Sequence, residues 1–421
     1  MLATLRQRNF ALVWFGGLVS LIGDRAMLTA LPFYVYQQTG STIGMAALFT
    51  AYYLPMVFFG SVAGVFVDRW DRRRIMIVTN LVQASVMLLL LLVRSAEWLW
   101  LIYLVAFVQS SASMFFGPAE SAIVPNLVEE KYLVPANSLG SLNNNIARLA
   151  GPPIGGALLG LFGLGGVVLV DSASFLIAAV LISFVSVSSR PSTAQTEQVD
   201  ATDEAASSWR GVWREWKQGL SLIRADRLLV ALFVVNTLTS FGGSMIDPLY
   251  APFVQDVLHG GPTARGLLST TGAIGGLLAA LIVGRFGGKL QPWQLTAFGT
   301  VAVGLLMLAT YNQTSLPVVM VLTLAMFVPL VAANVGTQTM LQTGVTDNFR
   351  GRVYGAIHTT IALVGLVSLW LGGVFGDILG IVPMLSVAAG ITFVAGVLGL
   401  VLLPRSARHQ KPVEGESPAT S

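Results

Sequence analysis

The sequence predicts an all-α membrane protein whose twelve transmembrane helices form two similar bundles of six. Hydrophobic residues make up 54% of the 421 residues and charged residues only 10%, whereas a soluble domain is about a quarter charged. Nearly all of the chain lies in apolar runs that are long enough to cross a hydrocarbon core. One long polar segment, near 188–226, divides these runs into six and six.

Each apolar run is expected to be a helix, because lipid offers no partner for free backbone N–H and C=O groups. The first run is longer than the apolar region of a signal peptide, so we interpret it as a retained span. The expected spans lie near 10–36, 42–67, 75–94, 98–127, 137–162, 166–187, 227–256, 263–285, 292–311, 316–345, 352–379 and 382–403.

The basic residues predict the orientation of these spans. Twenty of the 24 lysines and arginines fall on one side of the assignment, two on the other and two inside spans. Positively charged loops stay in the cytoplasm. We therefore expect a multi-pass protein of the inner or plasma membrane with both termini in the cytoplasm.

The expected organisation has four parts: a six-helix bundle at 1–187, a cytoplasmic linker at 188–226, a second six-helix bundle at 227–403 and a disordered cytoplasmic tail at 404–421. The second half of the linker repeats apolar residues at helical spacing between basic ones, from Trp209 to Ile223. This pattern is typical of a helix in the membrane interface. The alternative is a helix packed beneath the bundle.

The spans also sort by type with a period of three. The second, fifth, eighth and eleventh carry glycines four residues apart, which lets helix backbones approach closely, so they are expected where the two bundles meet. The first, fourth, seventh and tenth carry polar side chains and are expected around a wet cavity. Candidate cavity-lining residues are Gln109, Met114, Phe115, Asn236, Phe241, Met245, Asn334 and Gln338.

Charged residues inside the expected spans are candidates for proton coupling. A charge near the bilayer centre costs roughly 2.5–3.5 kcal/mol on insertion scales, so it should face a cavity or a partner. A carboxylate whose neighbours change between two conformations can bind a proton in one and release it in the other. The candidates are Asp24, Arg25, Glu120, Arg148 and Asp247.

Alternatives remain open for these acids. Asp24 could instead form a permanent structural ion pair with Arg148. Glu120 could reach water near the cytoplasmic end of its span. Asp171 and Asp377 lie nearer to span ends and are expected to meet water.

Two motifs resemble known sequences. The segment from Gly64 through Asp68 and Arg69 to Arg74 resembles the signature loop of the major facilitator superfamily, with Asp71 where that family usually has glycine. The segment Gly151-Pro152-Pro-Ile-Gly155-Gly156 resembles the fifth-span motif of drug/proton antiporters. The segments Phe116-Gly-Pro-Ala-Glu120-Ser-Ala-Ile-Val-Pro125 and Arg350-Gly-Arg352-Val resemble the subgroup that contains macrolide-efflux proteins and the enterobactin exporter.

The resemblance implies the two-bundle fold of this superfamily and a gate on the cytoplasmic face. The gate residues would be Gly64, Asp68, Arg69, Arg72 and Arg73. Independently of the family, Asp68 lies among four arginines at a helix end, where a carboxylate can pair with arginine or with a helix N-terminus. The arginines alone would be explained by topology.

No enzyme is expected. The chain has no cysteine and three histidines, and it lacks the zinc-protease, nucleophile-elbow and phosphate-loop motifs, so we expect no catalytic residues, metal or cofactor. The leading hypothesis is proton-coupled efflux of an amphipathic small molecule by a monomer. Alternatives are export of a siderophore or lysolipid, or a permease that is not coupled to protons.

Overall fold

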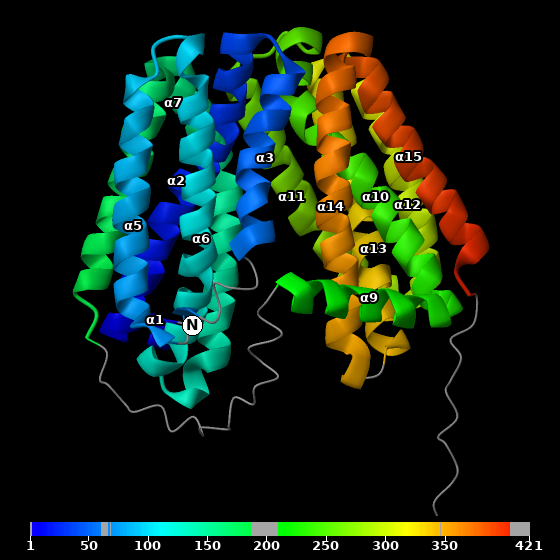
Figure 1. The fold of residues 1–421 in the computed structure, drawn as a ribbon, viewed down its shortest axis with the longest axis horizontal. Helices are drawn as coiled ribbons and strands as arrows, with labels where there is room; N and C mark the ends of the chain where they lie inside the picture. The colour runs from blue at the N-terminus through cyan, green and yellow to red at the C-terminus, as the bar shows by residue number, and fades with distance from the viewer. Residues whose placement is uncertain (1, 60–65, 68, 187–208, 346, 405–421) are drawn as a thin grey trace, which may run out of the picture.

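The computed structural model describes residues 2–59, 66–67, 69–186, 209–345 and 347–404. Within these ranges every regular element is a helix (Figure 1). Eleven helices are long and apolar enough to span a membrane. Their bounds are α2 (Arg8–Thr39), α3 (Thr42–Phe59), α5 (Arg72–Leu88, continued by a 3-10 turn Leu89–Leu92), α6 (Leu99–Leu127), α7 (Leu133–Ser183), α10 (Arg227–Pro252), α11 (Pro262–Phe286), α12 (Pro292–Tyr311), α13 (Leu316–Gly344), α14 (Asp347–Leu379) and α15 (Ile381–Leu402).

Helix α7 crosses twice, which brings the number of crossings to the twelve expected. It has 51 residues and is interrupted at Gly163, whose φ of 66° lies in the left-handed region that favours glycine. Leu139 near its beginning and Ile182 near its end belong to one apolar cluster with Phe10. The chain therefore turns back at Gly163, between the expected fifth and sixth spans.

Side-chain and glycine caps set several helix ends. α2 ends at Gly40, where φ is 59° and the N–H donates to the Tyr36 carbonyl at 2.8 Å. Asp71 begins α5 by accepting from the Arg74 N–H at 2.7 Å, so the departure from the signature loop supplies a helix cap. Asp226 begins α10 in the same way, from two N–H groups of its first turn.

The two groups of helices meet through the glycine-bearing spans. α3 packs against α14 and α10, and α7 packs against α11. The prediction that the second, fifth, eighth and eleventh spans face the other bundle is confirmed. Figure 1 shows α2 to α7 on one side and α10 to α15 on the other. The domain bounds near 187 and 227 remain a prediction, because 187–208 lies outside the described residues.

The fifth-span motif lies where α7 crosses α2. A Cβ added at Gly155 would overlap the backbone of Ala26, and one at Gly151 would overlap Arg25 and Ile22. Gly156 instead faces α11, against Thr263 and its neighbouring proline. The motif thus brings one helix into backbone contact with its own bundle and with the other.

Replacing Gly155 by Val should destabilise the first bundle, because the side chain must displace backbone rather than a flexible neighbour. Overpacking of this kind costs about 1–3 kcal/mol or more. The thermal unfolding midpoint of the purified variant should fall. Gly140→Val is the matched control, because it lies on the same helix with nothing within 4 Å of an added Cβ. Equal midpoints for the two variants would contradict the tight crossing.

Helix α9 (Trp209–Ala225) packs against α14 of the second bundle, as the alternative expected, and its place in the membrane interface stays a prediction. The Trp216 indole N–H donates to Thr360 Oγ1 at 3.1 Å, and Gly219 lies against the Arg352 backbone of α14. Ile223 is buried in the same cluster. Trp213, on the outer side, is 48% exposed. Part of the apolar stripe is therefore used to bind α14.

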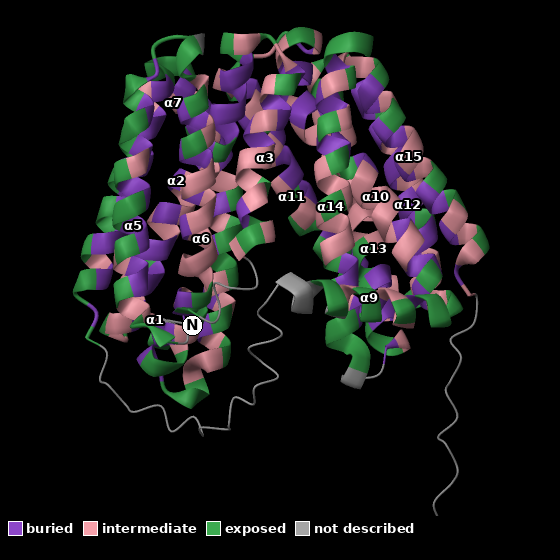
Figure 2. Ribbon diagram, in the orientation of Figure 1, coloured by how far each residue is buried: buried purple, intermediate pink, exposed green. Residues whose placement is uncertain are grey.

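Exposed apolar side chains cover the outer helices. They are frequent on α5, the second part of α7, α11 and α15, and fewer lie on α12. Figure 2 shows where exposed residues lie along these helices. α5, the second part of α7, α12 and α15 correspond to the third, sixth, ninth and twelfth expected spans, and α11 corresponds to the eighth. A surface of this kind needs a hydrocarbon environment rather than water.

Candidate functional site

The two bundles are joined at the end that holds the α2–α3 and α14–α15 turns, here called the far end; α9 lies at the opposite, linker end (Figure 1). Asp377 of α14 accepts from the Thr42 N–H at 2.6 Å, the Thr42 hydroxyl at 2.7 Å and the Ser41 hydroxyl at 2.6 Å. A carboxylate of one bundle thus caps the first turn of α3 in the other. Asp377 is exposed, as expected.

A second contact closes the far end between α2 and the extension of α10. The Tyr36 hydroxyl donates to Asp256 Oδ2 at 2.5 Å. Asp256 lies in a π-helical turn, Phe253–Val257, which follows Pro252. Such turns often occur at functional sites. Sequence analysis gave no signal for this pair, because its partners are 220 positions apart.

Asp247 makes a hydrogen bond between the bundles away from the far end. Its Oδ2 accepts from the hydroxyl of Tyr53 on α3 at 2.9 Å. Tyr53 is 11 positions after Thr42, which at 1.5 Å per residue is roughly 16 Å along the helix. The structure therefore places this candidate acid between the bundles, at about half the depth of a hydrocarbon core.

Arg265 of α11 supplies a positive charge near this contact. Its guanidinium carbon lies 4.0 Å from the centre of the Tyr250 ring, in cation–π geometry, and its charge acts on Asp247. Its Nε has no hydrogen-bond partner among the described residues. Arg265 is one of the two basic residues that the sequence analysis counted on the side away from the cytoplasm, although it lies two residues into the eighth expected span.

The described residues contain no hydrogen bond between the bundles at the linker end. The hydrogen bonds that do join the bundles are donated by Tyr36, Ser41, Thr42, Ile43, Tyr53 and Thr270. The hydroxyl of Thr270 donates to the Leu149 carbonyl at 3.3 Å. All of them lie between the far end and the middle of the helices. The structure therefore represents a conformation closed at the far end.

Asp24 and Arg25 lie half-buried in the middle of α2. Arg148 is exposed on α7, and its charge acts on Arg25. No ion pair within 4 Å joins Asp24 to Arg148, both of which the structure describes. The alternative of an ion pair between Asp24 and Arg148 is therefore wrong for this conformation, because the arginine that neighbours Asp24 is Arg25.

Asp171 corrects another expectation. It was expected to meet water, but it is 1% exposed. Asp171 lies near the end of a span, but helix α2 covers it from water. A Cβ added at Gly23 of α2 would collide with Asp171 and Ser174. The missing side chain at Gly23 was the available signal.

Glu120 of α6 reaches α2. Its Oε1 lies 3.0 Å from where a Cβ of Gly17 would be, and the residue is half-buried. Nearby, the Asn143 amide donates to the Trp14 carbonyl at 2.9 Å. Glu120 thus lies at a junction of α2, α6 and α7, far from Asp247 in the chain and in the other bundle.

Some of the expected cavity-lining residues are accessible in this conformation, and others are buried. Met114, Phe115, Asn236 and Phe241 are half-buried, and Asn334 and Gln338 are exposed. Gln109 and Met245 are 6% and 3% exposed, so their assignment to an accessible cavity wall is wrong in this conformation. Met245 packs on Gly372 of α14, where the close helix contact covers it.

The signature loop is described in part. Gly64 and Asp68 lie outside the described residues. Arg72 donates to the Ala122 carbonyl at 3.2 Å, and Arg73 to the Ile182 and Ser183 carbonyls. Arginine at carbonyls near helix ends is favourable. The gating role of these arginines stays a prediction.

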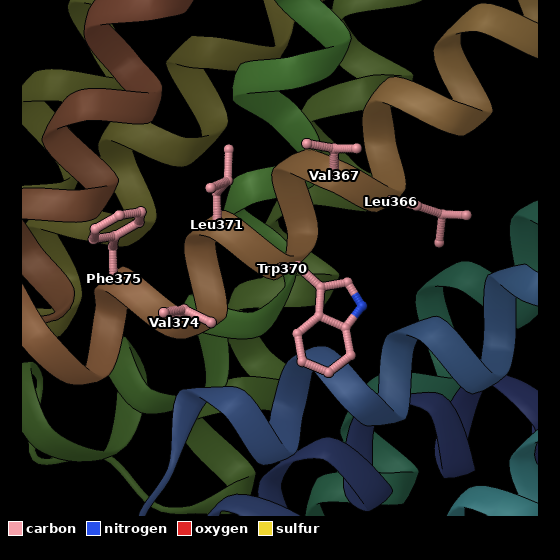
Figure 3. Close-up of a pocket in the computed structure, with 6 residues that line it drawn as sticks. All are labelled: Leu366, Val367, Trp370, Leu371, Val374 and Phe375. Atoms are coloured by element: carbon pink, nitrogen blue, oxygen red, sulfur yellow. The ribbon is translucent and has the colours of Figure 1, made fainter.

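Two pockets accompany this arrangement. One, of about 840 Å³, lies at the linker-end side of α3, α5 and α6 and is lined by aromatic side chains with Arg69 and Arg74. Phe115 belongs to its wall. The other, of about 390 Å³, lies on α14, where Trp370 points toward the first bundle (Figure 3). Its walls are apolar: Leu366, Val367, Trp370, Leu371, Val374 and Phe375.

Twelve crossings in two bundles, joined at one end and with ionisable groups between and within them, define a polytopic transport protein. The chain belongs to the family described as transmembrane secretion effector, whose profile matches residues 1–415. The members are major facilitator transporters and not enzymes, so the predicted superfamily and non-enzymatic class are confirmed.

Similar proteins agree with this assignment. Macrolide efflux protein A of Streptococcus pyogenes is 26% identical over 380 residues, covering 89% of this chain and 90% of the relative. A protein assigned as a bacilysin exporter, BacE, of Bacillus amyloliquefaciens is 26% identical over 364 residues, covering 84% and 86%.

Solved structures share the fold at low sequence identity. A bacterial homologue of the iron transporter ferroportin, in an inward-facing state, has a TM-score of 0.72 at 15% identity, covering 94% of this chain and 98% of that one. The nucleoside transporter NupG has a TM-score of 0.72 at 14% identity, covering 94% and 100%. These likenesses support the two-bundle fold.

Proposed function

We propose that this transporter exports amphipathic small molecules in exchange for protons, by alternating closure of its two ends. It acts as a monomer in the cell membrane with both termini in the cytoplasm. In that orientation, the far end faces outward and the linker end inward. The described conformation is then the one that loads substrate from the cytoplasm.

The hydrogen bond between Tyr53 and Asp247 carries the proposal. An ionised Asp247 accepts a charge-assisted hydrogen bond across the bundles and balances the nearby Arg265. A proton on Asp247 removes its charge and weakens both interactions. Because the contact joins the bundles in the conformation closed at the far end, proton binding on Asp247 weakens that conformation and shifts the equilibrium between conformations.

The class of cargo rests on weaker support. The pocket on α14 is wholly apolar, and the larger pocket combines mostly aromatic and aliphatic side chains with Arg69, Asp71 and Arg74. Such surfaces suit a molecule with a large apolar body and few polar groups. The named relatives, a macrolide efflux protein and a bacilysin exporter, are also exporters. We therefore favour drug-like cargo over a siderophore or lysolipid.

Reconstitution in vesicles tests the exchange. Purified protein is inserted into liposomes with an imposed pH gradient and offered a panel of macrolides, lipophilic cations and siderophores. We expect uphill movement of at least one macrolide or lipophilic cation, opposite in direction to proton flow and abolished by a protonophore. Empty liposomes and liposomes without a gradient are the controls. Movement that is indifferent to the gradient would reject proton coupling.

A further inference from the structure

Asp171 lies in the first bundle as a buried acid with an unused oxygen. Its exposure is 1%, and its Oδ2 has no hydrogen-bond partner among the described residues. Its Oδ1 accepts from the Ser174 hydroxyl at 3.3 Å, a long contact. A carboxylate with so few donors in a dry environment is costly, and such groups neutralise by binding a proton.

The backbone of α2 is shaped to receive this side chain. Asp171 Oδ1 and Ser174 Oγ occupy the space where a Cβ of Gly23 would lie. Gly23 directly precedes Asp24 in the chain. The carboxyl group of Asp171 therefore reaches the turn of α2 that carries Asp24, and the charges of the two acids act on each other.

Few other charges face the two acids. On α2, Arg25 acts on Asp24. On α7, Arg148 acts on Arg25. On α3, the hydroxyl group of Tyr52 is affected by the charges of both Asp24 and Asp171. Helix α5, which also packs on α7, carries its only charges in its first turn and presents the Ala84 carbonyl to Ser172 at 2.9 Å.

We propose that Asp24 and Asp171 form one proton-binding site that holds a single proton between two carboxyl groups in this conformation. Two carboxylates in one site of low dielectric cannot both ionise at moderate cost, so the pair titrates as a unit. Asp171 is then a second coupling residue beside Asp24. The transport role rests on the proposed proton exchange, whereas the shared proton does not.

The pair differs from Asp247 in what changes when the bundles move. Asp24 and Asp171 belong to the same bundle, and α2 and α7 stay packed through Gly151 and Gly155. The acids therefore keep each other as neighbours, and their access to water changes instead. The proton reaches this site from whichever end is open.

Infrared titration of the purified protein tests the shared proton without any transport. The wild type should show two separated carboxyl steps that belong to the pair. Asp171→Asn should remove the upper step, and Asp24→Asn should do the same. Glu97→Gln, at an exposed acid, should leave both. An upper step that survives Asp171→Asn would overturn the proposal, and Asp24→Asn decides it if the first variant does not fold.

The transport role is tested in vesicles with a pH gradient. Asp171→Asn should lose gradient-driven accumulation, and Asp171→Glu should restore part of it, with Glu97→Gln as the unchanged control. Full accumulation by Asp171→Asn would overturn the coupling role. A wild type that does not respond to the gradient would instead sink the proposed function, and the infrared result would still decide whether the two acids share a proton.

Discussion

Replacing Asp247 by Asn is expected to abolish proton-driven accumulation of substrate while exchange of labelled for unlabelled substrate persists. Asn cannot bind and release a proton near neutral pH, so the proposed link between titration and the Tyr53 contact is lost. Both fluxes are measured in the same liposome preparation. Asn at Asp247 retains the volume and an oxygen that can accept from Tyr53, so loss of folding is a small concern.

Tyr53→Phe removes the hydrogen bond to Asp247 but leaves the carboxyl group that is proposed to bind the proton. The carboxyl group remains, so coupling should persist, but the far-end closed conformation loses one hydrogen bond to a charged group, worth about 1.5–3 kcal/mol. Tyr34→Phe is the matched control, since no hydrogen bond to its hydroxyl is found in the described part of the chain. If Asp247→Asn accumulates substrate as well as Glu97→Gln does, Asp247 has no part in coupling.

Replacing Asp377 by Ala should open the far end. The variant removes the acceptor for Ser41, for the Thr42 hydroxyl and for the first N–H groups of α3. Loss of a helix cap costs about 0.5–2 kcal/mol, and loss of hydrogen bonds to a charge costs about 1.5–3 kcal/mol. We expect the ratio of open to closed conformations to rise about tenfold or more.

Spin labels on the two bundles measure this change. The chain has no cysteine, so Gln38→Cys and Ile378→Cys can be labelled without other substitutions, and both positions are exposed at the far end. Pulsed dipolar spectroscopy should show a longer distance component in Asp377→Ala than in the parent. Asp377→Asn, which keeps one acceptor oxygen, should lie between them. Identical distance distributions would contradict a closing role for Asp377.

The fold could be predicted from the sequence because the membrane restricts the choices. A run of apolar residues must be a helix, and its length fixes a crossing. The first expected span, 10–36, corresponds to α2 at Arg8–Thr39. The glycine spacing also located the faces where the bundles meet. The role of α9 was less certain, because one amphipathic stripe serves equally against lipid or against α14.

The site was only partly predictable. A charge within an apolar run stands out, so Asp247 and Asp24 were found. Their partners were not found, because the hydroxyl of Tyr53 is 194 positions from Asp247 and helical phase does not say which neighbour a tyrosine meets. Asp171 was misjudged since distance from a span end measures depth along the helix and not the cover provided by other helices.

The contact between α7 and α11 has a mechanical consequence. At Gly156 and Gly266, backbone meets backbone: the two glycines lie against Thr263 and Pro152 of the facing helices. At these two glycines the contacts are with backbone atoms, so a small tilt there needs no change of rotamer, whereas the Thr270 hydroxyl still joins the same two helices at the Leu149 carbonyl. We expect this backbone contact to permit a change of tilt between the bundles at less cost than a contact between large side chains would. A branched side chain at Gly156 or Gly266 would clash with the facing backbone, and we expect it to slow the conformational change in each transport cycle.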